Sequence, residues 1–228
     1  MTRTLAQYEA RLAAFLMDEA NAVWPTTTLD EALRQALNEY SQANPLSLET
    51  VLTVPAAGRE IALNGLGGMN GLQQVTDVWW PYDSGAVTQG WPPNRPRGWR
   101  LWWDDAQAVL VLDAVAGSEP RAGDEVRVWY TVGQRIQGLD GADATTVCTE
   151  HESLVVLGAA AYACWSRSVD QTETAATAAV ATPNYAALAL RFLRLFRARL
   201  QEIRTGQGQV RGAPFGPGWR LDRWDAAS

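Results

Sequence analysis

The chain of 228 residues contains no lysine, one histidine and two cysteines. Its 19 basic residues are all arginines, which reflects either a G/C-rich coding genome or a preference for planar, bidentate cations at interfaces. Charged residues make up 19% of the chain, and the formal net charge is −6. A protein held on DNA or on an anionic membrane by bulk charge is basic, so this composition argues against non-specific binding of either kind.

The sequence also lacks a recognisable catalytic or metal-binding pattern. His151 has no nucleophile and orienting group at a suitable spacing, and its place near a predicted helix start indicates a solvated or capping role. The cysteines and the histidine match no zinc spacing. Asp104 and Asp105 are adjacent between two strand patterns, which predicts a turn rather than a facing pair of catalytic carboxylates. We therefore expect no enzymatic activity, no cofactor and no metal.

Long apolar runs are absent as well. The chain has neither the roughly 18 uninterrupted apolar residues of a membrane span nor the apolar core of a signal peptide near its first residue. Cys148 and Cys164 lie in one predicted helix, about 24 Å apart at 1.5 Å per residue, whereas a disulfide needs Cα atoms within about 7 Å. We expect a soluble protein from a reducing compartment, with both thiols free and no membrane partner.

Helical patterns occur toward both ends of the chain. One face of the first predicted helix is apolar, and this helix ends near Asp18; the second spans 29–43 and starts with a capping box at Thr28 and Glu31. A third helix is expected to start at a second capping box, Thr149 and Glu152. A fourth is expected to open at Thr182 and Pro183. The apolar face of this last helix comprises Tyr185, Leu188, Phe192, Leu195, Phe196 and Ile203.

Strand patterns fill the middle of the chain. LSLETVLTV and REIALNG predict a hairpin about the turn at 55–58. LQQVTDVWWPY, WRLWW, AVLVLDA and DEVRVWYTV predict four further strands, the last with an apolar face of Val126, Val128, Tyr130 and Val132. Residues 85–98 contain several prolines and predict an exposed loop.

This order of elements predicts an α+β protein. We expect an antiparallel bundle of about four helices with an inserted antiparallel β-sheet or sandwich and an extended C-terminal arm. The helices of the bundle are assigned to 1–46 and 136–205, the tryptophan-rich β insert to 47–135 and the arm to 206–228.

Tryptophan is the most unusual component, with eleven in the chain. Adjacent pairs on a strand place one ring on each face of a sheet, so one ring can fill the core while the other meets a neighbouring subunit. Stacking of exposed rings on sugars is the alternative, and it would make the β region a carbohydrate-binding module. The predicted subunit or tail interface consists of Trp79, Trp80, Trp91, Arg95, Arg97, Trp102 and Trp103.

Two further surfaces are predicted near the C-terminus. Arg191, Arg194 and Arg197 share one face of the last helix, which is a solvated surface, a nucleic-acid contact or a docking strip for an acidic partner. The negative net charge disfavours the nucleic acid. The glycine-rich and proline-rich segment from Gly206 onward predicts a disordered arm that orders in a groove of its partner. Its anchors are Phe215, Trp219, Arg220, Leu221 and Trp224.

Three segments carry a resemblance to a known family: TLDEALRQALNEYSQANP, AGDEVRVWYTVGQRIQGLDGADATT and ESLVVLGAAAYA. By order and character they cover most of residues 28–165. In these segments the chain resembles the head-to-tail connector, or adaptor, proteins of tailed bacteriophages and related prophage-like particles.

The resemblance implies a homo-oligomeric, dodecameric ring in the virion neck, made in the host cytoplasm. Such a ring docks beneath the portal protein, extends the DNA channel and binds a downstream tail or stopper protein, with the arm from Gly206 reaching the portal. DNA then passes through without specific binding. Because an acidic wall repels phosphate, we expect acidic residues to outnumber arginines on the channel wall. A carbohydrate-binding or tail-associated module and an enzyme of unfamiliar type are the alternatives.

Overall fold

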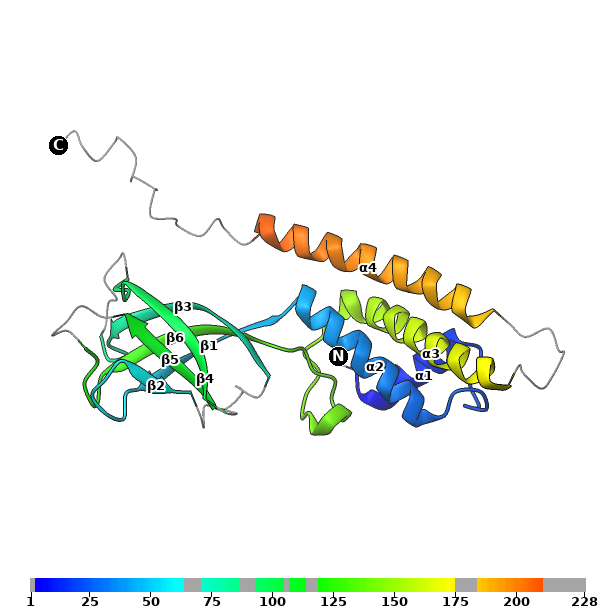
Figure 1. Ribbon diagram of the computed structural model, residues 1–228, viewed down its shortest axis with the longest axis horizontal. Coiled ribbons are helices and arrows are strands. Elements are labelled where there is room, and N and C mark those ends of the chain that lie inside the picture. The colour runs from blue at the N-terminus through cyan, green and yellow to red at the C-terminus, as the bar shows by residue number, and fades with distance from the viewer. Residues whose placement is uncertain are drawn as a thin grey trace, which may run out of the picture. The chain divides into compact units, whose positions relative to one another are not determined.

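The computed structural model describes residues 3–63, 71–86, 93–104, 107–113, 119–174 and 184–210, without the side chains of 107, 170–174 and 207–210. Within these residues the chain forms four α-helices and two small antiparallel sheets (Figure 1), which confirms the predicted α+β class. The chain divides into a helical unit of residues 1–44 and 136–228 and a β unit of residues 45–135. Each unit has its own buried apolar cluster.

The helical unit contains four α-helices and two short 3-10 turns. The bounds are α1 Leu5–Phe15, α2 Thr26–Ala43, η1 Leu139–Gly141, η2 Thr149–His151, α3 Glu152–Thr174 and α4 Tyr185–Val210. Helix α3 packs against the other three α-helices, most extensively against α2 and α4.

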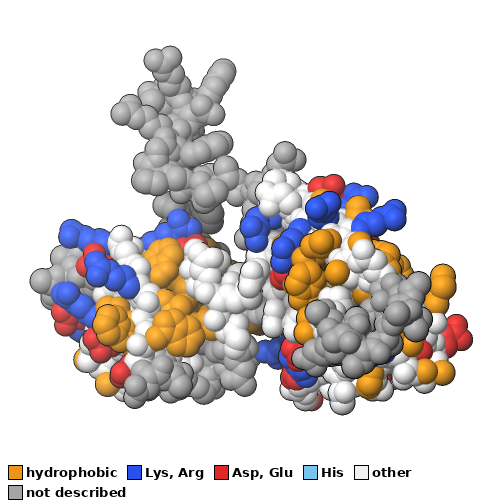
Figure 2. Space-filling model, turned by 45° about the vertical axis from the view of Figure 1, so that its right-hand side comes forward, with side chains coloured by type: hydrophobic (Ala, Val, Ile, Leu, Met, Phe, Trp, Pro, Cys, Tyr) orange, Lys and Arg blue, Asp and Glu red, His pale blue; other side chains and the backbone are white. Residues whose placement is uncertain are grey.

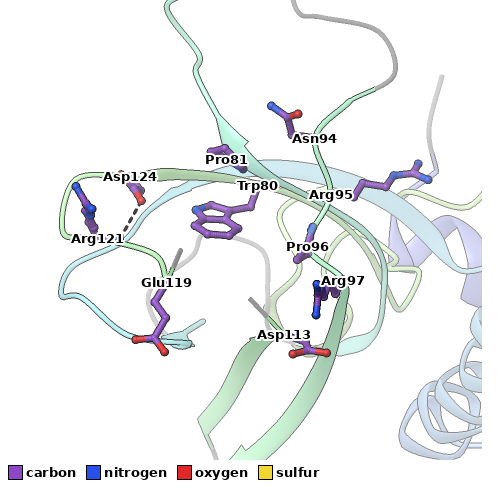
Figure 3. Close-up of a pocket in the computed structure, with 10 residues that line it drawn as sticks. All are labelled: Trp80, Pro81, Asn94, Arg95, Pro96, Arg97, Asp113, Glu119, Arg121 and Asp124. Carbon is purple, nitrogen blue, oxygen red and sulfur yellow. Dashed lines mark hydrogen bonds between the residues drawn. The ribbon is translucent and has the colours of Figure 1, made fainter. Parts of the chain in front are cut away.

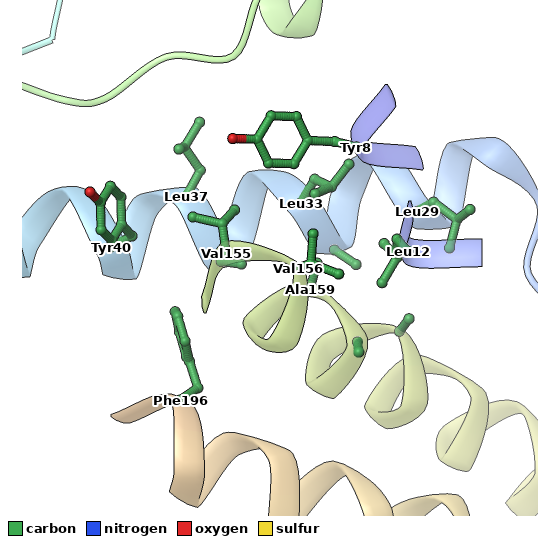
Figure 4. Close-up of a cluster of buried hydrophobic side chains, with 14 of the residues drawn as sticks. Tyr8, Leu12, Leu29, Leu33, Leu37, Tyr40, Val155, Val156, Ala159 and Phe196 are labelled. Atoms are coloured by element: carbon green, nitrogen blue, oxygen red, sulfur yellow. The ribbon is translucent and has the colours of Figure 1, made fainter. Parts of the chain in front are cut away.

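Aromatic and aliphatic side chains from all four helices fill the core of this unit. Figure 4 shows Tyr8 and Leu12 of α1 and Leu33 of α2 beside the small side chains of α3, with Phe196 of α4 lying below Val155. All five of these labelled side chains are fully buried. Burying a large side chain is worth about 1.5–3 kcal/mol, so this cluster is the main source of stability for the unit.

Gly158 makes room for the last helix. A Cβ atom at this position would lie 2.8 Å from two ring carbons of Phe196 and 3.0 Å from the Cβ of Ala36. Any larger residue therefore displaces the ring. Ala159, Ala160 and Ala161 are buried as well, so α3 presents small residues to the helices around it, and Gly158 lies where α2 and α4 approach closely.

The helix starts differ from the predicted capping boxes. Helix α2 begins at Thr26 after Pro25, and Glu31 pairs with Arg34 in its second turn instead of capping the start. At α4, the side chain of Asn184 accepts a hydrogen bond from the backbone N–H of Ala187 at 3.0 Å, which is the N-cap geometry. The predicted cap, residues 182–183, lies outside the described residues.

Glu152 at the start of α3 binds arginines instead of forming a capping box. Its carboxylate lies 2.7 Å from Arg3 and 3.1 Å from Arg11, and its side chain is only 3% exposed. Both arginines come from the N-terminal segment, so the carboxylate ties that segment to α3. The predicted box was wrong because Glu152 points into this cluster.

The β unit consists of two three-stranded sheets. Sheet one has the order β1–β6–β3 and sheet two the order β2–β5–β4. All pairs are antiparallel. The strand bounds are β1 Leu46–Thr53, β2 Glu60–Ala62, β3 Leu72–Tyr82, β4 Gly98–Asp104, β5 Gln107–Asp113 and β6 Glu125–Val132.

The predicted hairpin between the first two strands is wrong. β1 pairs along its whole length with β6, from Leu46 opposite Val132 to Thr53 opposite Glu125, whereas β2 pairs with β5. The connection after β1 therefore carries the chain from one sheet to the other. Sequence proximity favoured a hairpin, but the long apolar face of β6 offers β1 a better partner.

One buried cluster contains side chains of both sheets, so the sheets share a core. The predicted inner face of β6 is confirmed, because Val126, Val128, Tyr130 and Val132 are each 3% exposed or less. They meet residues of sheet two such as Ile61, Leu110 and Leu112 in that core. The alternate residues of β6 face outward and form part of the surface described next.

Candidate interaction surfaces

An arginine enclosed by aromatic rings lies on the outer face of sheet one. The guanidinium carbon of Arg127 lies 4.8 Å from the ring centroid of Trp129, 5.4 Å from that of Trp79 and 5.5 Å from that of Tyr82. The ring centroids of Trp79 and Trp129 are 4.3 Å apart. Glu49 of β1 binds the same guanidinium at 2.7 Å, and this hydrogen bond raises the pKa of Arg127. We call Arg127 and the three rings of Trp79, Tyr82 and Trp129 the aromatic cluster.

Asp77 fixes the position of Trp79 at the edge of this cluster. Its carboxylate accepts hydrogen bonds from the indole N–H of Trp79 at 3.0 Å and from Arg95 at 2.7 Å. Trp79 and Arg95 were both predicted to form an interface, and Asp77 now links them. These two hydrogen bonds hold the Trp79 ring in place at the edge of the cluster.

Trp80 points the other way, into the core, as predicted for an adjacent pair. It is 9% exposed, and its ring lines a recess of about 480 Å³ (Figure 3). Figure 3 shows Glu119, Arg121 and Asp124 on one side of this ring and Arg97 and Asp113 on the other. Both carboxylates and guanidinium groups line the recess, without a convergent set suited to acid–base or nucleophilic catalysis among the described residues.

The second tryptophan pair does not follow the prediction of one buried ring. Trp102 and Trp103 are 64% and 53% exposed. Trp103 occupies an inward position of β4 opposite Ala108, but only Asp104 follows it before the strand ends. Both indoles therefore remain largely in solvent, although Ala108 opposite Trp103 is buried.

The outer side of α4 combines arginines with leucines. Arg191 and Arg194 are exposed, and neither forms an ion pair with another described residue. Arg197 instead binds Glu39 of α2 at 2.8 Å, and the hydroxyl of Tyr162 donates to the same carboxylate. These contacts lower the pKa of Glu39, with the hydrogen bond from Arg197 as the largest cause. Of the three predicted docking arginines, Arg197 is thus engaged within the chain.

The apolar face of α4 also differs from the prediction. Phe196 is fully buried, but Leu188 is 40% and Leu195 51% exposed. Ala189 and Leu200 take the buried positions instead. Figure 2 shows basic side chains on the helical unit next to hydrophobic side chains that remain on its surface. Helix α4 continues to Val210, so residues 206–210, predicted to belong to the arm, are helical.

His151 contacts a buried tyrosine. Its Nδ1 lies 2.8 Å from the hydroxyl of Tyr40, which also accepts a hydrogen bond from the side chain of Asn44. Burial raises the pKa of Tyr40. Within the described ranges, no three histidine, cysteine or acidic residues are grouped so that they could hold a metal ion.

The two cysteines are free, but they do not share a helix. Cys148 is exposed and precedes η2, whereas Cys164 is buried in α3. Burial raises the pKa of the Cys164 thiol to about 11, so this thiol is a poor nucleophile at neutral pH.

Several predicted interface residues lie outside the described residues: Trp91, Phe215, Trp219, Arg220, Leu221 and Trp224. Conversely, sequence reasoning did not single out Arg127, Trp129 and Tyr82 of the aromatic cluster. The alternation of β6 did place Arg127 and Trp129 on its outer face. What the sequence could not supply was the pairing of β6 with β3, which brings them to Trp79.

Comparison with protein-family models and with curated protein sequences finds no match to this chain. In the described part of the chain, no helix is both long enough and apolar enough to cross a membrane.

Proposed function

We propose that this chain is a structural adaptor subunit of a phage or phage-like head-to-tail connector. In this proposal the four helices form an antiparallel bundle, the β unit is inserted between its second and third helices, and the chain after Val210 is an extended arm. Copies assemble into a ring beneath the portal protein, extend the DNA channel and bind the tail or a stopper protein.

The observation that carries the proposal is the aromatic and aliphatic surface that the single chain leaves uncovered. Trp102 and Trp103 each leave more than half of their surface exposed. A tryptophan side chain offers about 200 Å², so covering half of one ring is worth about 2.5 kcal/mol at 25 cal/mol per Å². Aromatic anchors of this kind are typical of subunit interfaces. The three family-like segments support the same class of protein.

Native mass measurement of the purified chain, alone and mixed with the portal protein of the same particle, tests the proposal. We expect a ring-sized assembly in at least one of the two conditions. The double variant Trp102→Ala/Trp103→Ala should lose a subunit or tail contact while the chain still folds, because neither ring belongs to the core. A chain that stays single in both conditions at high concentration contradicts the proposal.

A separate truncation tests whether the arm binds the portal protein. Truncation after Val210 keeps all of α4 and removes Phe215, Trp219, Arg220, Leu221 and Trp224. We expect the truncated chain to fold and to attach more weakly to the portal. Unchanged attachment would show that the arm is not the portal-binding segment.

Exposure of two adjacent indoles also favours a second candidate, a carbohydrate-binding or tail-associated recognition module. Exposed aromatic rings can stack on sugars, and Trp102 and Trp103 lie next to each other at the end of β4. Binding of the single chain to a glycan array, lost in Trp102→Ala, would favour this candidate over the connector.

A further inference from the structure

Charge is divided unevenly along this chain. Residues 185–228 contain eight arginines and three acidic residues, a formal charge of +5, whereas residues 1–184 contain eleven arginines and 22 acidic residues, a charge of −11. The two values add to the net charge of −6. Helix α4 carries most of the basic side chains of the C-terminal part, so it is basic in an otherwise acidic protein.

The exposed side of α4 presents a stripe with helical spacing. Leu188, Arg191 and Leu195 occupy positions i, i+3 and i+7, which lie along one side of a helix, and Arg194 is next to them. The leucines are about half exposed, and the two guanidinium groups have no ion-pair partner among the described residues. This stripe therefore exposes apolar area to solvent and carries positive charge that is not paired among the described residues.

A groove of complementary character lies along α1 of the same unit. It has a volume of about 430 Å³, and the residues that line it include the alanines Ala10 and Ala13 and the carboxylates of Glu9 and Glu19. The described residues that line it include no arginine. Alanines let a second helix approach closely, and the carboxylates lie where arginines of that helix could reach them.

Glu9 forms no ion pair with an arginine among the described residues. Burial, followed by the neighbouring Asp30, raises the pKa of Glu9 to about 7. In addition, one oxygen of the Asp30 carboxylate is buried without a hydrogen-bond partner among the described residues. An arginine arriving from outside would stabilise this pair of carboxylates.

We infer that the exposed stripe of α4 docks on a second copy of this chain, with Arg191 and Arg194 entering the groove between Glu9 and Glu19. When each copy places its stripe on one neighbour and offers its groove to another, the contact is heterologous, and repeating it produces a closed ring or an open filament. The inference rests on the proposed function for its expectation of a ring, and it names the surfaces that make that ring.

Charge reversal on each surface tests the inference in the full-length chain. We expect Arg191→Glu/Arg194→Glu and Glu9→Arg/Glu19→Arg to raise the apparent dissociation constant of self-assembly at least about tenfold each, since like charges then face one another. Mixing the two variants in equal amounts should restore assembly, because each acidic surface then meets a basic one. Arg100→Glu/Arg204→Glu carries the same change of charge at other positions and should assemble like the wild type.

Sedimentation velocity at about 50 mM and about 500 mM salt gives the readout, with weaker assembly expected at the higher ionic strength. Circular dichroism confirms that each variant is folded. A wild-type assembly that both charge reversals leave intact, or one that the mixture fails to restore, overturns the inference and leaves the proposed function standing. Loss of portal attachment with the ring intact also overturns it. A wild-type chain that never assembles, with or without portal protein, contradicts the proposed function itself.

Discussion

Substitution of Gly158 by alanine tests how α4 is held on the helical unit. The added Cβ would lie 2.8 Å from Cε2 and Cζ of Phe196 and 3.0 Å from the Cβ of Ala36. Neither neighbour can move into open space, because both side chains are fully buried.

Two opposing effects set the magnitude. Overpacking a core costs about 1–3 kcal/mol, and contacts below 3.0 Å with an aromatic ring place this site near the upper end. Replacing a helical glycine by alanine gains about 1 kcal/mol. We therefore expect Gly158→Ala to lower the free energy of unfolding of the helical unit by about 2 kcal/mol.

Denaturant titration followed by circular dichroism at the helical band measures this value, because the helices are confined to the helical unit. Gly206→Ala is the matched control: a Cβ on this helical glycine meets nothing within 4 Å, so we expect stabilisation of up to about 1 kcal/mol. In a Phe196→Leu background the cost of Gly158→Ala should shrink, because the clashing ring is gone. If Gly158→Ala stabilises the unit as much as Gly206→Ala does, the close packing described for α3 and α4 is refuted.

Three further predictions concern charged groups of the helical unit. The pKa of Asp18 is lowered, first by the hydrogen bond from the backbone N–H of Trp24. The carboxylate therefore stabilises the fold above the ordinary aspartate pKa, and this stabilisation is lost as pH falls. Asp18→Ala should lower the melting temperature at pH 7, and the difference from the wild type should shrink in acid. The pKa of Glu9 is raised to about 7, so the wild type should lose stability as pH rises from about 4.5 to 7, and Glu9→Gln should melt higher than the wild type at pH 8 but not at pH 4. Arg197→Ala should cost on the order of 1 kcal/mol in denaturant titration, because it removes the guanidinium partner of the Glu39 carboxylate, whereas Arg194→Ala should change nothing in the single chain.

Periodicity predicted the elements of this protein better than it predicted their contacts. The strand candidates 72–82 and DEVRVWYTV match β3 and β6 closely, because alternation of apolar and polar residues is a local property. The pairing of β1 with β6 joins residues about 80 positions apart, and no local pattern reports it. The hairpin between β1 and β2 was predicted wrongly because the two strands are joined by a short connection, which usually indicates that strands pair.

The same distinction applies to side chains on the surfaces. Spacing placed Arg191, Arg194 and Arg197 on one helix face, but only the packing of α4 showed that Arg197 reaches Glu39. Leu188 and Leu195 have the spacing of a buried face, yet Gly158 admits Phe196 as the deepest side chain and thereby fixes the rotation of the helix. A glycine that defines a packing site carries no apolar signal of its own, so the sequence could not reveal this rotation.

Pairing of the first residue of β1 with the last residue of β6 has a consequence for how this architecture can vary. Leu46 lies opposite Val132, and Cα atoms across such an antiparallel pair are about 5 Å apart. The two ends of the segment 46–132 therefore lie close together, so this segment can be treated as an insertable cassette. A linker of a few residues is long enough to replace the whole cassette, and an unrelated domain with equally close ends could be transplanted there without stretching the chain on either side.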